Sequence, residues 1–391
     1  MPTHSRRFWR WPLGVGLVSA LTALIILVSG YLIRISSGLP TLRADAWPLA
    51  SDAWWYVSIA GRGYHAAGLA DAPGLPGLHD FAFFPLWPIF IRAGAPLAQT
   101  AIELALSALL GALGLYLLAL LLWYRVLRQR YGKRAARRTI ALAAFAPPAV
   151  VVAAGYSEPL YLLLLAAFFA LIGGAELGGT RKSPRARFRG GVSEATGNRI
   201  RLMGLFLIGI ALGLTRASAL ALLPALLLLP SSRRTRLVAS AGLIFGLSVW
   251  AGYIAGLTGQ LDGFWTGIPA WLAVTGQPRG LADWLGRTGL NLLDLRAWVP
   301  LALPTLVGIG AILAYRRRER TEATYAALSI GIALAAGVIT SAERYVWPAL
   351  FLVGPALVER MSPRTFRIVL GISLLLYLLY ALTMAAGLRD P

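Results

Sequence analysis

The chain has 391 residues, of which 58% are hydrophobic and only 14% are charged, and its formal net charge is +21. Soluble globular domains carry about 25% charged residues, so this composition favours a surface that faces lipid. With no cysteine and three histidines, the chain excludes disulfides, thiolate chemistry and a metal site built from histidines.

Eleven apolar runs predict an all-α polytopic membrane protein, expected as a single transmembrane domain over residues 1–391. A helix needs about 20 residues to cross the hydrocarbon core. The first run is too long for a cleaved signal peptide, which predicts an uncleaved N-terminal span. The runs are Trp11–Ile33, Thr100–Trp123, Thr139–Ala154, Pro159–Leu177, Leu202–Leu214, Ala217–Leu229, Leu237–Leu257, Trp298–Tyr315, Ala323–Thr340, Tyr345–Val358 and Ile368–Ala386.

The distribution of the cations predicts the orientation of these spans. Lys and Arg cluster in every second connection, for example in 125–138, 178–201 and 316–320. Because cytoplasmic loops are enriched in such cations, we expect the N-terminus inside and the C-terminus outside. The strong preference for Arg over Lys suggests a bacterial sequence, and hence the bacterial cytoplasmic membrane. No nucleic-acid partner is expected, because nucleic-acid-binding domains present one continuous basic face.

Two long segments on the predicted external side, 35–99 and 258–297, are where we expect the chemistry. Loops longer than about 12–15 residues are usually functional or disordered. A composition rich in tryptophan argues against disorder, since these segments contain Trp47, Trp54, Trp55, Trp87, Trp265, Trp271 and Trp284. The two segments are therefore predicted to form interfacial helices.

The stretch 44–62 predicts one such helix, ended by glycines. On it Asp52, Trp55 and Tyr56 share one face. Aromatic residues at headgroup depth also serve as simple anchors, and that interpretation suffices for the tryptophans alone. A carboxylate among aromatic residues loses solvation free energy, and this cost is not offset unless the carboxylate has a partner or a function. Asp52 is therefore a candidate for chemistry.

Four further segments carry candidate residues. Pro85 and Pro88 predict an irregular aromatic stretch over 81–88. Glu158 lies at a short external turn, where it either stabilises a helix N-terminus or has a functional role. Arg216 and Arg344 lie in apolar surroundings, and a guanidinium there could hold a phosphate by two hydrogen bonds. The alternatives are structural pairing with Glu158 or Glu343, and extension of the side chain to the headgroups.

These residues resemble the signature of the PIG-V mannosyltransferases, the family of GPI mannosyltransferase II, within the GT-C glycosyltransferase superfamily. Ser51 stands where that pattern usually has tryptophan, and Pro159 where it has serine, but neither change removes a charge. The matching segments, in order, are Asp52–Ala60 with Gly63-Tyr64, Phe81–Pro88, Tyr156-Ser157-Glu158, Gly213–Arg216, and Arg344-Tyr345 with Pro348.

The resemblance implies an enzyme that transfers a hexose, expected to be mannose, from a polyprenyl-phosphate donor to a glycan, glycolipid or protein acceptor on the external face. GT-C enzymes invert the sugar by direct displacement, which gives Asp52 the role of general base and Arg344 or Arg216 that of phosphate ligand. No cofactor or metal is expected. The substrate groove is expected to include Trp55, Tyr56, Tyr64, Phe84, Trp87, Tyr156, Glu158 and Tyr345.

The main alternative is a multi-pass transporter or lipid flippase that handles a lipid-linked sugar without chemistry. Many transporters are built from inverted repeats. No such repeat is visible in this sequence, because the two long external segments are unlike each other. A structural or assembly protein would leave Asp52 without a role.

Overall fold

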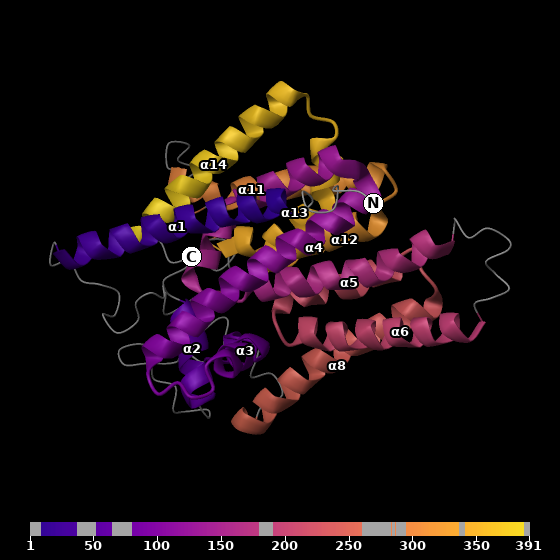
Figure 1. Cartoon of the computed structure of the whole chain (residues 1–391), viewed down its shortest axis with the longest axis horizontal. Helices are drawn as coiled ribbons and strands as arrows, with labels where there is room; N and C mark the ends of the chain where they lie inside the picture. Colours follow the sequence, from indigo (N-terminus) through magenta and orange to yellow (C-terminus); the bar gives the residue numbers. More distant parts are fainter. Residues whose placement is uncertain are drawn as a thin grey trace, which may run out of the picture.

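The computed structural model describes residues 9–36, 52–64, 80–179, 191–259, 283, 286, 295–335 and 341–386. This part of the chain consists of helices and short connections without a strand, which confirms the predicted all-α class (Figure 1). The predictions for Trp47, Trp265, Trp271 and Trp284 lie outside the described residues. The elements are α1 (Arg10–Ser36), α2 (Asp52–Arg62), η1 (Asp80–Ala82), α3 (Leu86–Gly94), α4 (Ala101–Ala144), η2 (Pro147–Ala154), α5 (Glu158–Gly179), α6 (Gly191–Gly213), η4 (Ala217–Ala221), α7 (Leu222–Leu227), α8 (Arg233–Thr258), α11 (Leu295–Arg316), α12 (Arg320–Ala335), α13 (Ala342–Val358) and α14 (Pro363–Ala385).

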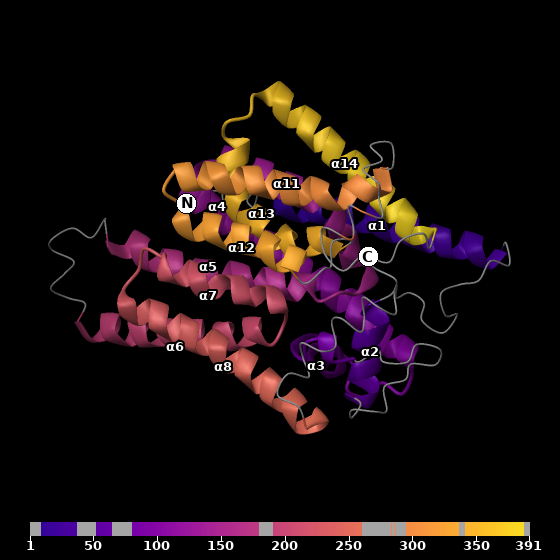
Figure 2. The ribbon, with the colours of Figure 1, turned by 180° about the vertical axis from the view of Figure 1, so that it is seen from behind.

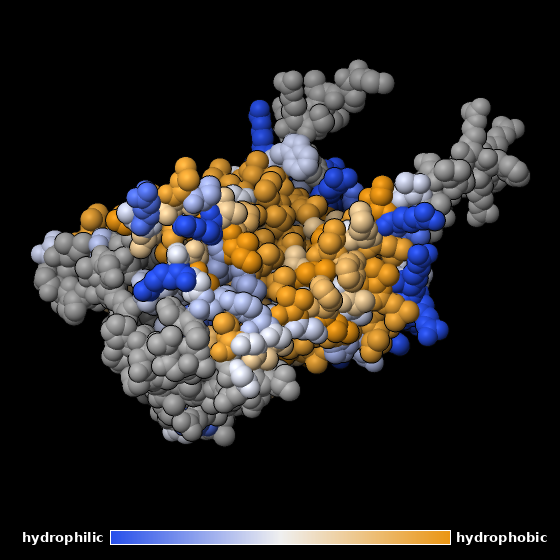
Figure 3. Space-filling view, turned by 90° about the horizontal axis from the view of Figure 1, so that it is seen from below, coloured by the Kyte–Doolittle hydropathy of each residue, from blue (hydrophilic) through white to orange (hydrophobic). Residues whose placement is uncertain are grey.

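The outer surface of the bundle is suited to lipid. Among the described residues, α1, α4, α8 and α14 are long and apolar enough to cross a membrane. A fifth span results if η2 and the start of α5, which are bent by 112° at their break, count as one. Figure 3 shows a broad apolar surface across the middle of the molecule, with hydrophilic side chains gathered at its right-hand end and others toward its left. This division is expected of a protein that spans a bilayer.

Most of the eleven predicted runs fall on one helix each, and the number that crosses the membrane stays a prediction. The runs Thr139–Ala154 and Ala217–Leu229 are exceptions, because the first divides between the end of α4 and η2 and the second between η4 and α7. The segment 125–138, expected as a loop, is instead largely helical inside α4, which breaks at Gly132 (φ 84°, ψ 172°). Glycine adopts this backbone conformation without a steric penalty from a Cβ atom, so the chain reverses there without a loop.

Two kinds of packing hold the bundle together. Helix α13 is apolar and is buried everywhere except at Tyr345 among its residues, as expected for a helix at the centre of a bundle. Helices α6 and α8 lie side by side (Figure 2) and approach through glycines spaced four residues apart on each helix. A Cβ atom at Gly242 or Gly246 would overlap the backbone of α6. Such small residues let membrane helices pack backbone to backbone.

The short helices α2 and α3 form a separate layer at one end of the bundle, where they pack on each other and on the first part of α4 (Figure 1). The indole nitrogen of Trp87 in α3 donates a hydrogen bond to the backbone oxygen of Gly155, at 2.9 Å. This bond ties the layer to the turn between η2 and α5. The layer thus fixes residues from α2 above the ends of the central helices.

A candidate active site at the end of the bundle

Local sequence explains how α2 presents Asp52. The helix buries Ala53, Tyr56 and Val57 against the bundle, and it ends at Gly63, whose φ of 79° is left-handed, as the predicted glycine cap requires. Asp52 is the first residue of α2, where a carboxylate interacts favourably with the helix dipole.

The neighbouring segment departs from the expectation. The predicted irregular stretch 81–88 is partly helical, because α3 begins at Leu86 and includes Pro88. A proline in the first turn of a helix removes no intrahelical hydrogen bond, so it is tolerated there.

A sharp turn presents Glu158. Gly155 has a left-handed φ of 77° at the end of η2, and Glu158 is the first residue of α5. The hydrogen bond from Trp87 to Gly155 holds this turn in place. The side chain of Glu158 is completely buried.

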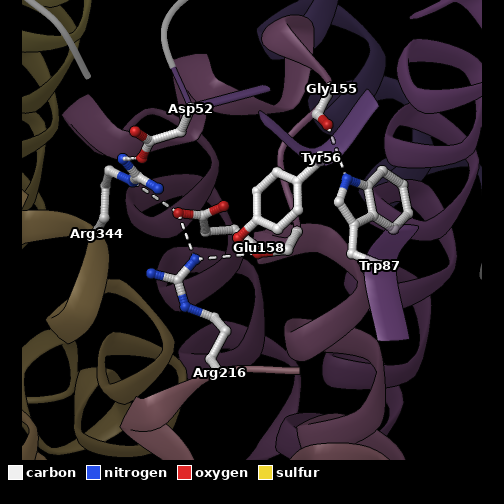
Figure 4. Close-up of polar contacts among 8 residues, drawn as sticks. Asp52, Tyr56, Trp87, Gly155, Glu158, Arg216 and Arg344 are labelled. Carbon is white, nitrogen blue, oxygen red and sulfur yellow. Dashed lines mark hydrogen bonds and ion pairs between the residues drawn. The ribbon is translucent and has the colours of Figure 1, made fainter. Parts of the chain in front are cut away.

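Four charged side chains from four different segments meet at this point (Figure 4). Arg344 Nη1 lies 2.7 Å from Asp52 Oδ2, and Arg344 Nε lies 2.7 Å from Glu158 Oε1. Arg216 Nη1 lies 2.6 Å from the same oxygen of Glu158. Glu158 therefore bridges the two arginines, and among the described residues Asp52 pairs with Arg344 alone.

The burial of the cluster decreases toward Asp52. The side chains of Glu158, Arg344 and Arg216 are 0%, 5% and 8% exposed, whereas that of Asp52 is 23% exposed. Two carboxylates and two guanidiniums cancel in formal charge, which offsets much of the free-energy cost of burying them. The second oxygen of Glu158, Oε2, is buried and accepts no hydrogen bond within the described part of the chain.

Tyrosines flank both arginines. The guanidinium carbon of Arg344 lies 4.5 Å from the ring centre of Tyr156, and that of Arg216 lies 5.3 Å from the ring centre of Tyr345. Both distances are within the range of a cation–π interaction. The hydroxyl of Tyr56 lies 3.0 Å from Ser157 Oγ, which is also a neighbour of Arg216. These contacts limit how far either guanidinium can move sideways.

The remaining predicted groove residues lie around the cluster without joining it. The ring of Trp55 stacks on Phe83, with centroids 5.8 Å apart. Tyr64 and Phe84 instead pack with Trp250 of α8 in a second, smaller core. Trp87 is completely buried.

The sequence reasoning missed one residue of this site. Ser157 was part of the matched Tyr156-Ser157-Glu158 turn but was given no role, and its hydroxyl contacts both Tyr56 and Arg216. The feature of the sequence that could have identified Ser157 is its position directly before Glu158. Among the described residues, no group of three or more His, Asp or Glu side chains is placed to hold a metal ion.

Comparison with known proteins bears out the resemblance seen in the sequence. The family model of the mannosyltransferase (PIG-V) matches residues 70–185. None of the curated proteins compared with the chain matches it significantly. The matched segment includes α3, the turn before α5 and Glu158, but neither Asp52 nor the two arginines.

Solved structures share the fold at low sequence identity. The apo oligosaccharyltransferase of Archaeoglobus fulgidus is 13% identical with a TM-score of 0.53, over 96% of this chain and 56% of that one. ArnT from Cupriavidus metallidurans bound to undecaprenyl phosphate is 16% identical with a TM-score of 0.52, over 92% of this chain and 62% of that one. The chain thus spans little more than half the length of these proteins, and the likeness shows that it shares their fold.

Proposed function

We propose that this GT-C membrane glycosyltransferase, whose residues 70–185 match the PIG-V mannosyltransferase family, transfers a hexose from a polyprenyl-phosphate donor. Mannose is the expected sugar, from the description of the family. The acceptor is a glycan, glycolipid or protein, and the reaction occurs on the external side of the membrane. ArnT, which shares the fold, is described as bound to undecaprenyl phosphate, and this supports a lipid phosphate as the leaving group.

One observation carries the proposal, namely the cluster of Asp52, Glu158, Arg216 and Arg344. Two arginines converge on one buried carboxylate oxygen at the end of an apolar bundle. A guanidinium binds phosphate oxygens through its planar fork, and phosphate contacts of this kind stabilise the charge that develops on a leaving phosphate. A partly exposed carboxylate lies directly beside them, as an acid–base reaction requires.

The proposed reaction is a single displacement at the anomeric carbon of the donor. The acceptor hydroxyl oxygen attacks this carbon and forms the new glycosidic bond, and Asp52 takes the hydroxyl proton. The bond between the anomeric carbon and the phosphate oxygen breaks, and its electron pair leaves with the polyprenyl phosphate. Arg344 and Arg216 offset the charge on that phosphate. Attack opposite to the leaving group inverts the anomeric configuration.

The test is a transfer assay with purified protein in proteoliposomes made from a native lipid extract. Polyprenyl-phosphate mannose and polyprenyl-phosphate glucose, each labelled in the sugar, are supplied in parallel, and the label is followed into new products. The proposal expects transfer from the mannose donor and the simultaneous appearance of free polyprenyl phosphate. Movement of the intact donor across the bilayer, without cleavage of its sugar–phosphate bond, would support the flippase alternative instead.

A further inference from the structure

The ion pairs in the cluster oppose the roles that the proposed function gives to its members. Arg344 is the proposed phosphate ligand and Asp52 the proposed base, yet Arg344 Nη1 lies 2.7 Å from Asp52 Oδ2. This contact occupies one oxygen of Asp52 and the edge of Arg344 that a phosphate would use. The pairing of Arg344 with Asp52 therefore competes with both proposed roles.

We propose that the donor phosphate replaces Asp52 on Arg344, so that the binding of the donor releases Asp52 to act as the base. This inference rests on the proposed function and concerns the regulation of the same site. In it, Glu158 keeps both arginines in place throughout the exchange. Until a lipid phosphate binds, Arg344 and Asp52 stay paired with each other.

Burial identifies Asp52 as the carboxylate that leaves. Glu158 is completely buried, and both arginines bind its Oε1 at 2.6 and 2.7 Å. Removing it would leave two guanidiniums without their shared counter-charge, which costs several kcal/mol for buried pairs. Asp52 has a 23% exposed side chain, and within the described part of the chain its one ion pair is with Arg344. Its ion pair is therefore the one that an incoming anion can displace.

The geometry of Arg344 suits such an exchange. Glu158 binds the guanidinium at Nε and Asp52 binds it at Nη1, so the two carboxylates use different edges of the fork. Displacement of Asp52 frees one edge, while the other stays fixed to Glu158. A phosphodiester carries one negative charge, as Asp52 does, so Arg344 exchanges one anion for another. Arg216, held by the same oxygen of Glu158, supplies a second cation nearby.

The exchange predicts that Asp52 weakens the binding of lipid phosphate. When a competitor occupies a binding group, the apparent affinity equals the intrinsic affinity multiplied by the fraction of the group that is free. The test measures the binding of undecaprenyl phosphate to purified full-length protein by native mass spectrometry. This lipid carries no sugar, so it cannot react. Asp52→Asn is expected to bind this lipid roughly five- to tenfold more tightly than wild type, although its sugar transfer should be strongly reduced.

Glu103→Gln is the matched control, because it removes one negative charge from the same end of the bundle. Glu103 caps α4 through the backbone of Gln99 and Thr100, and glutamine also serves in a capping box. Its affinity for undecaprenyl phosphate is expected to equal that of wild type. Tightening as large as that of Asp52→Asn would show a general charge effect and would overturn the exchange.

The remaining outcomes separate this inference from the proposed function. If wild type binds the lipid, Arg344→Lys weakens binding, and Asp52→Asn binds no more tightly than wild type, then the exchange is wrong and the phosphate site stands. If Arg344→Lys and Arg216→Lys both bind as wild type does, the donor site is not at this cluster, and both proposals fail. Thermal unfolding of each variant identifies any loss of binding that comes from loss of folding.

Discussion

The roles of single residues divide between chemistry and support. Asp52 is the only carboxylate of the ion-pair cluster that is partly exposed, whereas Glu158 is buried between two arginines. Asp52→Asn keeps the shape of the side chain but removes the base, so transfer should fall by roughly 10²–10⁴-fold. Initial rates with the labelled mannose donor measure this loss. Near wild-type turnover would mean that Asp52 is a structural partner of Arg344.

The two arginines should respond differently to replacement by lysine. Arg344 pairs with both carboxylates of the cluster, whereas Arg216 pairs with Glu158 and not with Asp52. Lysine keeps the charge but loses the planar fork, so Arg344→Lys should raise the apparent KM for the donor, with a further loss in kcat if the contact tightens as the phosphate leaves. Arg216→Lys should cause a smaller change. Initial rates against donor concentration measure both effects. If Arg216→Lys has the larger effect, the phosphate is assigned to Arg216.

The sequence identifies the site residues one by one, because a charge in an apolar stretch is visible without a structure. It does not identify their pairing. Asp52 and Arg344 are 292 positions apart, and Arg344 and Glu158 are 186 apart, so no helical period connects them. The sequence alone therefore could not choose between phosphate binding and pairing with Glu158. The structure shows that both arginines pair with Glu158, and their binding of a phosphate stays a prediction.

At the scale of the helices, the closest packing depends on glycine. Gly246 of α8 faces the backbone of Ile210 in α6, whereas Gly252 on the same helix has nothing within 4 Å. Gly246→Ala should destabilise the protein by about 1–3 kcal/mol through overpacking. Gly252→Ala should be neutral or slightly stabilising, because alanine favours helix. Thermal unfolding in detergent compares the two, and equal midpoints would contradict the packing of α6 on α8.

The helices were predictable where the bilayer dictates the length of an apolar run, as for α1, α8 and α14. The exceptions depend on backbone details that hydropathy does not report. Gly132 lets one polar segment stay helical on both sides of a sharp break. Pro88 was read as a helix breaker, but in the first turn of α3 it is compatible with a helix.

At the scale of the whole molecule, the proposed reaction requires the layer of α2 and α3 to face the outside. The chain has no cysteine, so single cysteines report their own side of the membrane. Leu97, next to this layer, is 90% exposed, and Arg360 is exposed in the turn between α13 and α14 at the opposite end. Leu97→Cys should react with an impermeant maleimide in intact cells, and Arg360→Cys only after permeabilisation. The reverse pattern would invert the predicted topology and place the donor on the cytoplasmic side.

The proposed reaction requires the cluster of Asp52, Glu158, Arg216 and Arg344 to hold the phosphate of the donor. The most direct measurement is a structure of the protein in nanodiscs with undecaprenyl phosphate, determined by electron cryomicroscopy. We expect phosphate density beside Arg216 and within hydrogen-bond distance of Arg344, at about 2.7–3.2 Å. We also expect Asp52 to be separated from Arg344. Phosphate density away from both arginines, with the ion pairs of Asp52 and Glu158 unchanged, would contradict these expectations.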